Sequence, residues 1–131
     1  MNESTETPGS AAEKFARYGV ADSDLAHVIV EFAEPMLKHC TSYAAREEAI
    51  SYAILAWNLS LESESGREES LHEMLAQLPA EKEPEIAALM QFLLRRKAEL
   101  FADNRFLVVD YTLERRGEKM QIEMTTKYIP R

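Results

Sequence analysis

The chain has 131 residues and a net charge of −8, with 46% hydrophobic and 29% charged residues. This size and composition indicate one globular domain with one core, and they exclude a chain that is disordered throughout. The single cysteine, Cys40, excludes an internal disulfide framework. The N-terminus lacks the features of a secretory signal, and the longest uncharged run, 49–61, has 13 residues, short of the roughly 20 that cross a bilayer. We therefore expect a soluble, cytoplasmic protein without a membrane partner.

The charge is unevenly distributed along the chain. Residues 1–94 carry 6 basic and 17 acidic residues, a net charge of −11, whereas residues 95–131 carry 9 and 6, a net charge of +3. An acidic body repels phosphate backbones, and the basic residues near the C-terminus alternate with acids. We expect no nucleic-acid partner. The alternative is a local basic patch formed by Arg95, Arg96, Arg115 and Arg116.

Residues 1–10 are polar, contain Pro8 and Gly9, and are predicted to form a disordered tail ahead of a single domain over 11–131. A short helix is possible over 11–18. The first main helix is predicted to begin at Asp22–Asp24 and to run to about residue 39, with apolar residues at helical spacing. Pro35 lies inside it, so we expect a kink.

Three further helices follow in the prediction. The second is capped by Thr41 or Ser42, and its buried face contains Tyr43, Ile50, Ala53, Ile54, Trp57 and Leu61. Residues 61–67 break the apolar periodicity and are predicted to be a loop. A short third helix with an apolar side at 71–78 ends at Pro79. The fourth begins near Pro84, in the first-turn position that proline tolerates, and continues to about residue 101.

After the Asp103–Asn104 turn, the apolar period changes from 3.6 to 2, which predicts an antiparallel hairpin with its turn at 115–118. Placing every apolar residue on one face requires a loop with an even number of residues, two or four. We expect Leu113 to face Met120, Tyr111 to face Ile122 and Val109 to face Met124. The predicted fold class is therefore α+β: four main helices, with a possible short fifth at the N-terminus, followed by a C-terminal antiparallel β-hairpin.

No motif identifies a catalytic, cofactor-binding or metal site. The four glycines are isolated, which excludes P-loop and dinucleotide fingerprints, and the chain contains no Gly-x-Ser-x-Gly or Cys-x-x-Cys sequence. The helical pairs Asp24/His27 and Glu69/His72 could contribute to a di-iron site with Glu31, Glu34 or Glu48. We favour an ordinary capping acid and solvated helix faces, and we expect no metal and no cofactor.

Two pairs of neighbouring residues are candidates for local roles. His39 and Cys40 are interpreted as a capping histidine and a small buried residue, not as a catalytic pair, because adjacent helical side chains point apart. Trp57 is predicted to be a core ring with its indole N–H bonded at the helix end, where Asn58 satisfies carbonyl groups. A ligand pocket beside them is the alternative.

The segment Ala56-Trp57-Asn58-Leu59-Ser60-Leu61, followed by an acidic loop and a leucine-rich helix, resembles small uncharacterised bacterial proteins with this helix ending. The resemblance covers one short segment. It implies a bacterial origin and no particular activity.

The preferred hypothesis for function is a non-enzymatic protein–protein interaction or regulatory module. The alternative is a small-ligand or metal-binding protein, or an enzyme, with a site between helices. Because a two-stranded hairpin has two open edges that helices are not expected to satisfy, we predict a homodimer formed through the C-terminal hairpin. Phe106 and Val108 are expected to be exposed on the face opposite the core, and the candidate interface residues are Phe106, Val108 and Thr125. The alternative is an edge protected by Lys119, Glu123 and Lys127.

Overall fold

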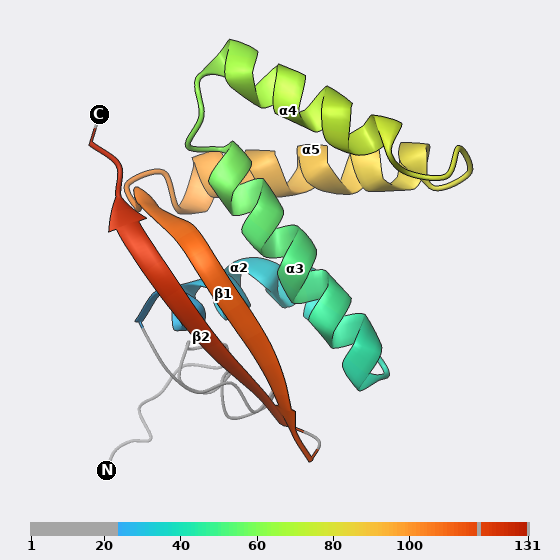
Figure 1. Cartoon of the computed structure of the whole chain (residues 1–131), viewed down its shortest axis with the longest axis vertical. Coiled ribbons are helices and arrows are strands. Elements are labelled where there is room, and N and C mark those ends of the chain that lie inside the picture. The colour runs from blue at the N-terminus through green and yellow to red at the C-terminus, as the bar shows by residue number, and fades with distance from the viewer. Residues whose placement is uncertain (1–23, 118, 131) are drawn as a thin grey trace.

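A computed structural model describes residues 24–117 and 119–130 of the chain. The predicted tail, the possible helix over 11–18 and the predicted helix start at Asp22 lie outside these residues. The described elements are α2 (Asp24–Leu37), α3 (Tyr43–Leu59), α4 (Glu64–Ala76), α5 (Glu83–Leu100), β1 (Phe106–Arg116) and β2 (Lys119–Tyr128). The predicted class is confirmed, because four helices precede an antiparallel two-stranded hairpin among the described residues (Figure 1).

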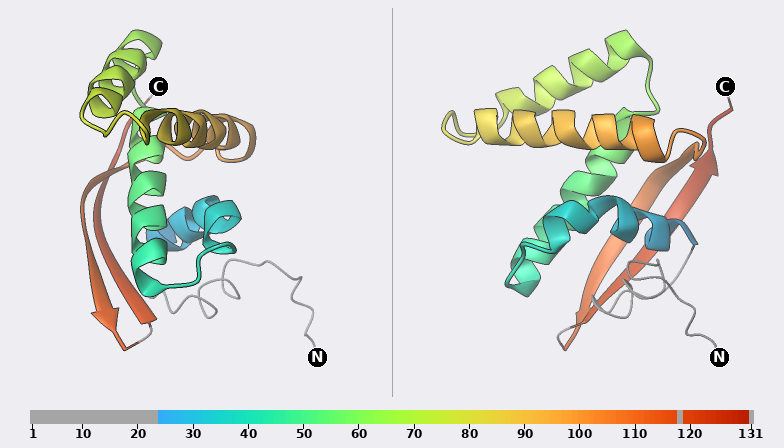
Figure 2. Two further views of the ribbon diagram at one scale, coloured as in Figure 1. Left: turned by 90° about the vertical axis from the view of Figure 1, so that its right-hand side faces the viewer. Right: turned by 180° about the vertical axis from the view of Figure 1, so that it is seen from behind.

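Helix α3 is the centre of the fold, because it contacts every other described element. The hairpin lies along one side of it, and α2 and α5 lie on the other (Figure 2). Its predicted buried face is confirmed at Tyr43, Ile50, Ala53, Ile54 and Trp57. Ser42 is the N-cap, since its hydroxyl accepts a hydrogen bond from Ala45 N at 3.1 Å.

Trp57 is fully buried within a group of three aromatic rings. Its ring centroid lies 5.3 Å from that of Phe32 and 5.8 Å from that of Phe101, in edge-to-face arrangements. Such pairs add about 0.5–1.5 kcal/mol each beyond the burial of their area. The prediction that Trp57 is a core ring is confirmed.

Pro35 lies in the last turn of α2, where it removes the backbone donor that the Glu31 carbonyl would receive in a regular helix. Arg96 of α5 replaces that donor: its Nη2 donates to Glu31 O and its Nε donates to Phe32 O, both at 3.0 Å. The orphaned carbonyl thus becomes the attachment point between α2 and α5. Arg96 has a structural role here.

Helix α4 differs from the prediction at its start. It begins at Glu64, inside the stretch 61–67 that was predicted to be a loop. The reason is a local cap, since the Ser63 hydroxyl accepts a hydrogen bond from Gly66 N at 3.2 Å. None of the helix's residues is buried. It therefore packs at the periphery of the fold through half-buried side chains such as Leu71 and Leu75.

Arg116 pairs with Lys119, so two positions of the sequence separate the ends of the strands. The even-numbered loop is confirmed, and Gly117 adopts the positive φ of 67° that such tight turns favour. The pairing is shifted by two residues from the expected one: Leu113 faces Ile122, not Met120. A shift of two preserves which residues share a face.

A β-bulge overturns the prediction for the base of β1. The register changes between Val108 and Asp110, so Val109 is an extra residue without a partner on β2. An extra residue reverses the alternation of side chains along its strand. Val108, expected to be exposed, is therefore buried at 4% exposure, whereas Val109, expected to face the core, is 56% exposed.

Candidate functional site

The outer edge of β1, which does not pair with β2, is covered at its base by side chains from the C-terminal end of α3. The Asn58 amide pairs with the backbone of Val108 in both directions: Val108 N donates to Asn58 Oδ1 at 3.0 Å, and Asn58 Nδ2 donates to Val108 O at 2.9 Å. A side-chain amide has the same donor and acceptor as a peptide group. Asn58 therefore occupies the place of a neighbouring strand.

Two more bonds complete this closure at Phe106. Trp57 Nε1 donates to Phe106 O at 2.7 Å, and Phe106 N donates to Asn104 Oδ1 at 3.2 Å. The predicted partners at the helix end were wrong: Trp57 and Asn58 use their polar groups on the strand. The expectation that helices leave both edges of the hairpin open was also wrong for this part of β1.

The outer edge of β2 has a different environment. Ile129 N donates to Arg105 O at 2.8 Å, so the backbone of Ile129 points toward β1. Backbone groups alternate in direction along a strand. The odd-numbered residues of β2 therefore direct their N–H and C=O groups toward β1, and the even-numbered residues direct theirs outward. The outward set is Met120, Ile122, Met124, Thr126 and Tyr128. Among the residues that the structure describes, no other element forms a hydrogen bond with these outward backbone groups. Within the described part of the chain, the edge of β2 is thus open along its length.

Side chains at the hairpin base add exposed apolar surface beside this open edge. Phe106 and Tyr128 face each other across the strands, with ring centroids 5.4 Å apart, and they are 43% and 53% exposed. Along the outer face of β2, Lys119, Glu123 and Lys127 alternate in charge and are exposed. This edge therefore has polar, apolar and charged groups available for a partner.

The three predicted interface residues have different environments. Phe106 is exposed, but both its backbone groups are bonded within the chain. Val108 is buried and held by Asn58, so it offers no free surface. Thr125 is exposed on the outer face of the hairpin, and its backbone groups face β1.

The candidate metal ligands are not brought together in the described part of the chain. The pair Glu69/His72 lies exposed on α4, and His27 lies half-buried on α2. No group of three possible ligands occurs among the described residues. Cys40 donates from Sγ to Met36 O at 3.4 Å, and burial raises the pKa of its thiol, which disfavours the thiolate that a nucleophile or metal ligand requires.

The candidate basic patch is divided between two distant parts of the fold. Arg96 binds carbonyl groups of α2, whereas Arg115 and Arg116 lie beside the hairpin turn, at the far end of the strands from α5 (Figure 1). Arg116 forms an ion pair with Glu114 at 2.6 Å. These arginines therefore do not form one surface.

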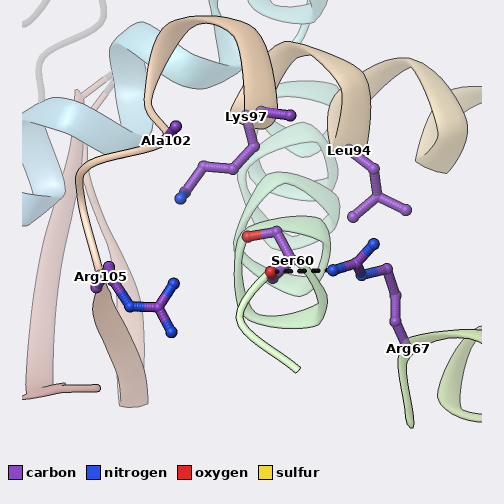
Figure 3. A pocket seen from close by; sticks show the side chains of 7 residues that line it. Ser60, Arg67, Leu94, Lys97, Ala102 and Arg105 are labelled. Carbon is purple, nitrogen blue, oxygen red and sulfur yellow. Dashed lines mark hydrogen bonds between the residues drawn. The ribbon is translucent and has the colours of Figure 1, made fainter. Parts of the chain in front are cut away.

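A cavity of about 160 Å³ lies between the ends of α3 and α5, the start of α4 and the start of β1, and it was not predicted (Figure 3). Its lining residues are Ser60, Arg67, Leu94, Lys97, Ala98, Ala102 and Arg105. The three cations are spaced 30 and 8 positions apart in the sequence. No local pattern could therefore have grouped them.

Each cation at this cavity is held in place by carbonyl groups. Arg67 donates from Nε to Leu59 O at 3.3 Å and from Nη2 to Ser60 O at 3.4 Å, which caps the C-terminal end of α3. Lys97 is buried at 3% exposure, donates from Nζ to Asn104 O at 2.9 Å, and lies 4.5 Å from the centroid of the Trp57 ring. Arg105 donates from Nε to Ile129 O at 2.8 Å.

No known protein family, curated protein or solved structure matches this chain. Within the described residues, none of the helices is both long enough and apolar enough to span a membrane.

Proposed function

We propose that this chain is a protein–protein interaction module and that it self-associates through the outer edge of β2, as a homodimer. The observation that carries this proposal is the contrast between the two edges of the hairpin. Side chains close the base of the β1 edge, and the described residues leave the β2 edge open. An open, regular strand edge is a template for pairing with another strand.

A twofold dimer joins the two β2 strands in antiparallel orientation. Hydrogen bonds between the two copies of β2 need residues whose backbone groups point outward on both strands. Even-numbered residues of one copy must therefore lie opposite even-numbered residues of the other. The register centred on Thr125 satisfies this condition. It places Glu123 of each copy opposite Lys127 of the other and Thr125 opposite its own copy, over residues 122–128.

Charge distinguishes this register from the others that satisfy the condition. Registers centred on an even-numbered residue of β2 place no acidic residue opposite a basic one. A register centred on Glu123 would place that carboxylate opposite itself and Lys119 opposite Lys127, which is unfavourable. A register centred on Gln121 pairs Glu123 with Lys119, but the strands then overlap only over 119–123. The Thr125 register thus combines two opposite-charge pairs with the longer overlap.

The same register gives the exposed Tyr128 a partner surface. Tyr128 of one copy lies opposite Ile122 of the other, on the face that packs against the helices. Ile122 is fully buried in its own core, so the tyrosine ring covers the rim of that core. The apolar contact adds to the backbone pairing.

The alternative is that Lys119, Glu123 and Lys127 protect the edge and keep the chain monomeric, as charged residues do on many edge strands. Sedimentation equilibrium at micromolar concentration separates the two. We expect a mass of twice 14.9 kDa. A mass of one chain across the whole concentration range would refute the dimer.

Cysteine cross-linking tests the register. Opposed residues in a non-hydrogen-bonded antiparallel pair have Cα atoms about 4.5 Å apart, within disulfide reach. In a Cys40→Ala background, Thr125→Cys should form a disulfide-linked dimer on mild oxidation, and Gln121→Cys should not. The opposite result assigns the Gln121 register. Cross-linking of neither excludes both registers, and the proline substitution described next then decides whether β2 forms the interface.

Proline substitution tests the hydrogen bonds themselves. Thr126 N points outward, so Thr126→Pro removes one donor from the open edge and leaves the hairpin pairing in place. We expect it to dissociate the dimer, whereas the control Thr126→Val, which keeps the N–H, should not. Val108 and Thr125 are unsuitable sites for this test, because their backbone donors serve Asn58 and β1. A dimer unaffected by Thr126→Pro would exclude the β2 edge.

A further inference from the structure

The cavity at the junction of α3, α4, α5 and β1 contrasts in charge with the body of the protein. Three of its seven lining residues are basic and none is acidic. The chain as a whole has a net charge of −8, with −11 in residues 1–94. Three cations around one small cavity repel each other, and an anion between them would relieve that repulsion.

Both arginines have N–H donors that no described residue accepts. Arg105 is held only through Nε, and among the described residues nothing accepts a hydrogen bond from its Nη1 or Nη2. Arg67 is held through Nε and Nη2, which leaves Nη1 without an acceptor in the described part of the chain. Figure 3 shows the two guanidinium groups on opposite sides of Ser60, with Lys97 above. The donors are thus fixed in position before any ligand binds.

We propose that this cavity binds the phosphate group of a small phosphorylated molecule. Arg67, Lys97 and Arg105 approach from three sides, an arrangement that suits a tetrahedral phosphate better than a planar carboxylate. A volume of about 160 Å³ equals that of a cavity that holds benzene, which is enough for a phosphate group. The net charge of −8 disfavours a nucleic-acid backbone as the source of that phosphate.

Thermal denaturation with inorganic phosphate as the probe tests the site. A ligand that binds only the folded state raises the unfolding midpoint. At equal ionic strength, we expect phosphate to raise the midpoint above its value in sodium chloride, and acetate to leave it unchanged. No shift with phosphate would refute the proposal, and an equal shift with acetate would refute the preference for phosphate.

Two variants locate the effect. Arg105→Gln removes the unused donors, and we expect calorimetry to show phosphate affinity lower by at least about tenfold, the usual scale for one charged hydrogen bond. The control Arg116→Gln removes the same charge from the hairpin turn and should bind normally. Undiminished binding by Arg105→Gln would place the phosphate elsewhere.

A third variant keeps the test decisive if Arg105→Gln does not fold. Ala98 is exposed on α5 and lines the cavity, so Ala98→Glu introduces a carboxylate beside the cations without burying it. We expect this variant to fold and to lose the phosphate shift; retention of the shift would refute the site.

A labelled single-stranded oligonucleotide at low salt should not bind, and competition between it and phosphate would assign the cavity to nucleic acid. None of these residues belongs to β2, so the result is independent of dimerisation.

Discussion

The two edges of the hairpin have opposite arrangements although they belong to one two-stranded sheet. At the base of β1, Trp57, Asn58 and Asn104 satisfy all four outward backbone groups of Phe106 and Val108. Along β2, the described residues provide no such partners. A helix can therefore close a strand edge when its last turn presents an amide and an indole toward it. The closed edge fixes the hairpin to α3, whereas no described residue holds the backbone of the other edge.

The largest expected effect on this comparison comes from Trp57. Trp57→Ala should lower the free energy of unfolding by about 3–5 kcal/mol, because it removes a fully buried ring and the bond to Phe106 O. Trp57→Phe is the control that keeps an aromatic ring and loses the donor and part of the buried volume, so its cost should be smaller. Chemical denaturation measures both. Equal stability of Trp57→Ala and the wild type would contradict the core role.

Asn58 tests the closed edge itself. Asn58→Ala should lower the free energy of unfolding by about 2–3 kcal/mol, because it leaves the N–H and C=O of Val108 without partners in a half-buried place. The control Asn104→Ala removes one bond to Phe106 N and should cost about 1 kcal/mol. If the two variants lose the same stability, the paired amide contributes no more than a single bond.

The bulge offers a matched pair of valines. Val108→Ala should cost about 1.5–2.5 kcal/mol, since it removes two buried methyl groups, whereas Val109→Ala should change stability by less than about 0.5 kcal/mol. Denaturant unfolding of both variants measures the difference. A larger loss of stability for Val109→Ala than for Val108→Ala would contradict the bulge, because it would mean that Val109 faces the core.

The smallest expected effect is at Tyr43, near the turn end of β1. Arg115 lies over its ring, with Cζ 4.7 Å from the centroid, and no described residue forms a hydrogen bond with the buried hydroxyl. Tyr43→Phe keeps the ring, so we expect unchanged or slightly higher stability, within about 1 kcal/mol. A clear loss would show that the hydroxyl is needed.

Alkaline pH gives a second reading of Tyr43. Burial raises its pKa above the ordinary value of 10.0, so the folded state holds the phenol proton where the unfolded state releases it. Unfolding therefore becomes easier as pH rises above 10.0, and stability from this group is complete below that pH. Tyr43→Phe should flatten this part of the stability–pH curve, as followed by denaturation between pH 9 and 11. An unchanged slope would assign the effect to other groups.

Local patterns in the sequence were sufficient to predict the four main helices and the even number of residues in the hairpin loop. Apolar spacing located α3 and α5, and the alternation along β2 gave its correct inner face. The start of α4 was predicted wrongly because Ser63 and Gly66 are residue types common in loops. In the structure, the Ser63 hydroxyl and Gly66 N form the helix cap. Val108 and Val109 could not be distinguished, because two adjacent valines fit either face and the sequence has no local signal for the bulge.

The other wrong predictions concern residues whose hydrogen-bond partners lie far away in the sequence. Asn58 and Val108 are 50 positions apart, so no local pattern could show that the amide closes a strand edge. Arg96 was considered for a basic patch, and its actual partner is the carbonyl group that Pro35 leaves free 65 positions away, at Glu31. The cavity lined by Arg67, Lys97 and Arg105 likewise depends on the packing of four elements.

Trp57 also gives the protein an internal optical reporter. It is the only tryptophan in the chain, and its indole N–H is bonded to a carbonyl of β1. Its fluorescence therefore depends both on burial by the helices and on attachment of the hairpin. If the hairpin separates from α3 before the helices unfold, the emission changes while the helical circular dichroism signal persists. If the two signals change together, the hairpin and the helices form a single cooperative unit.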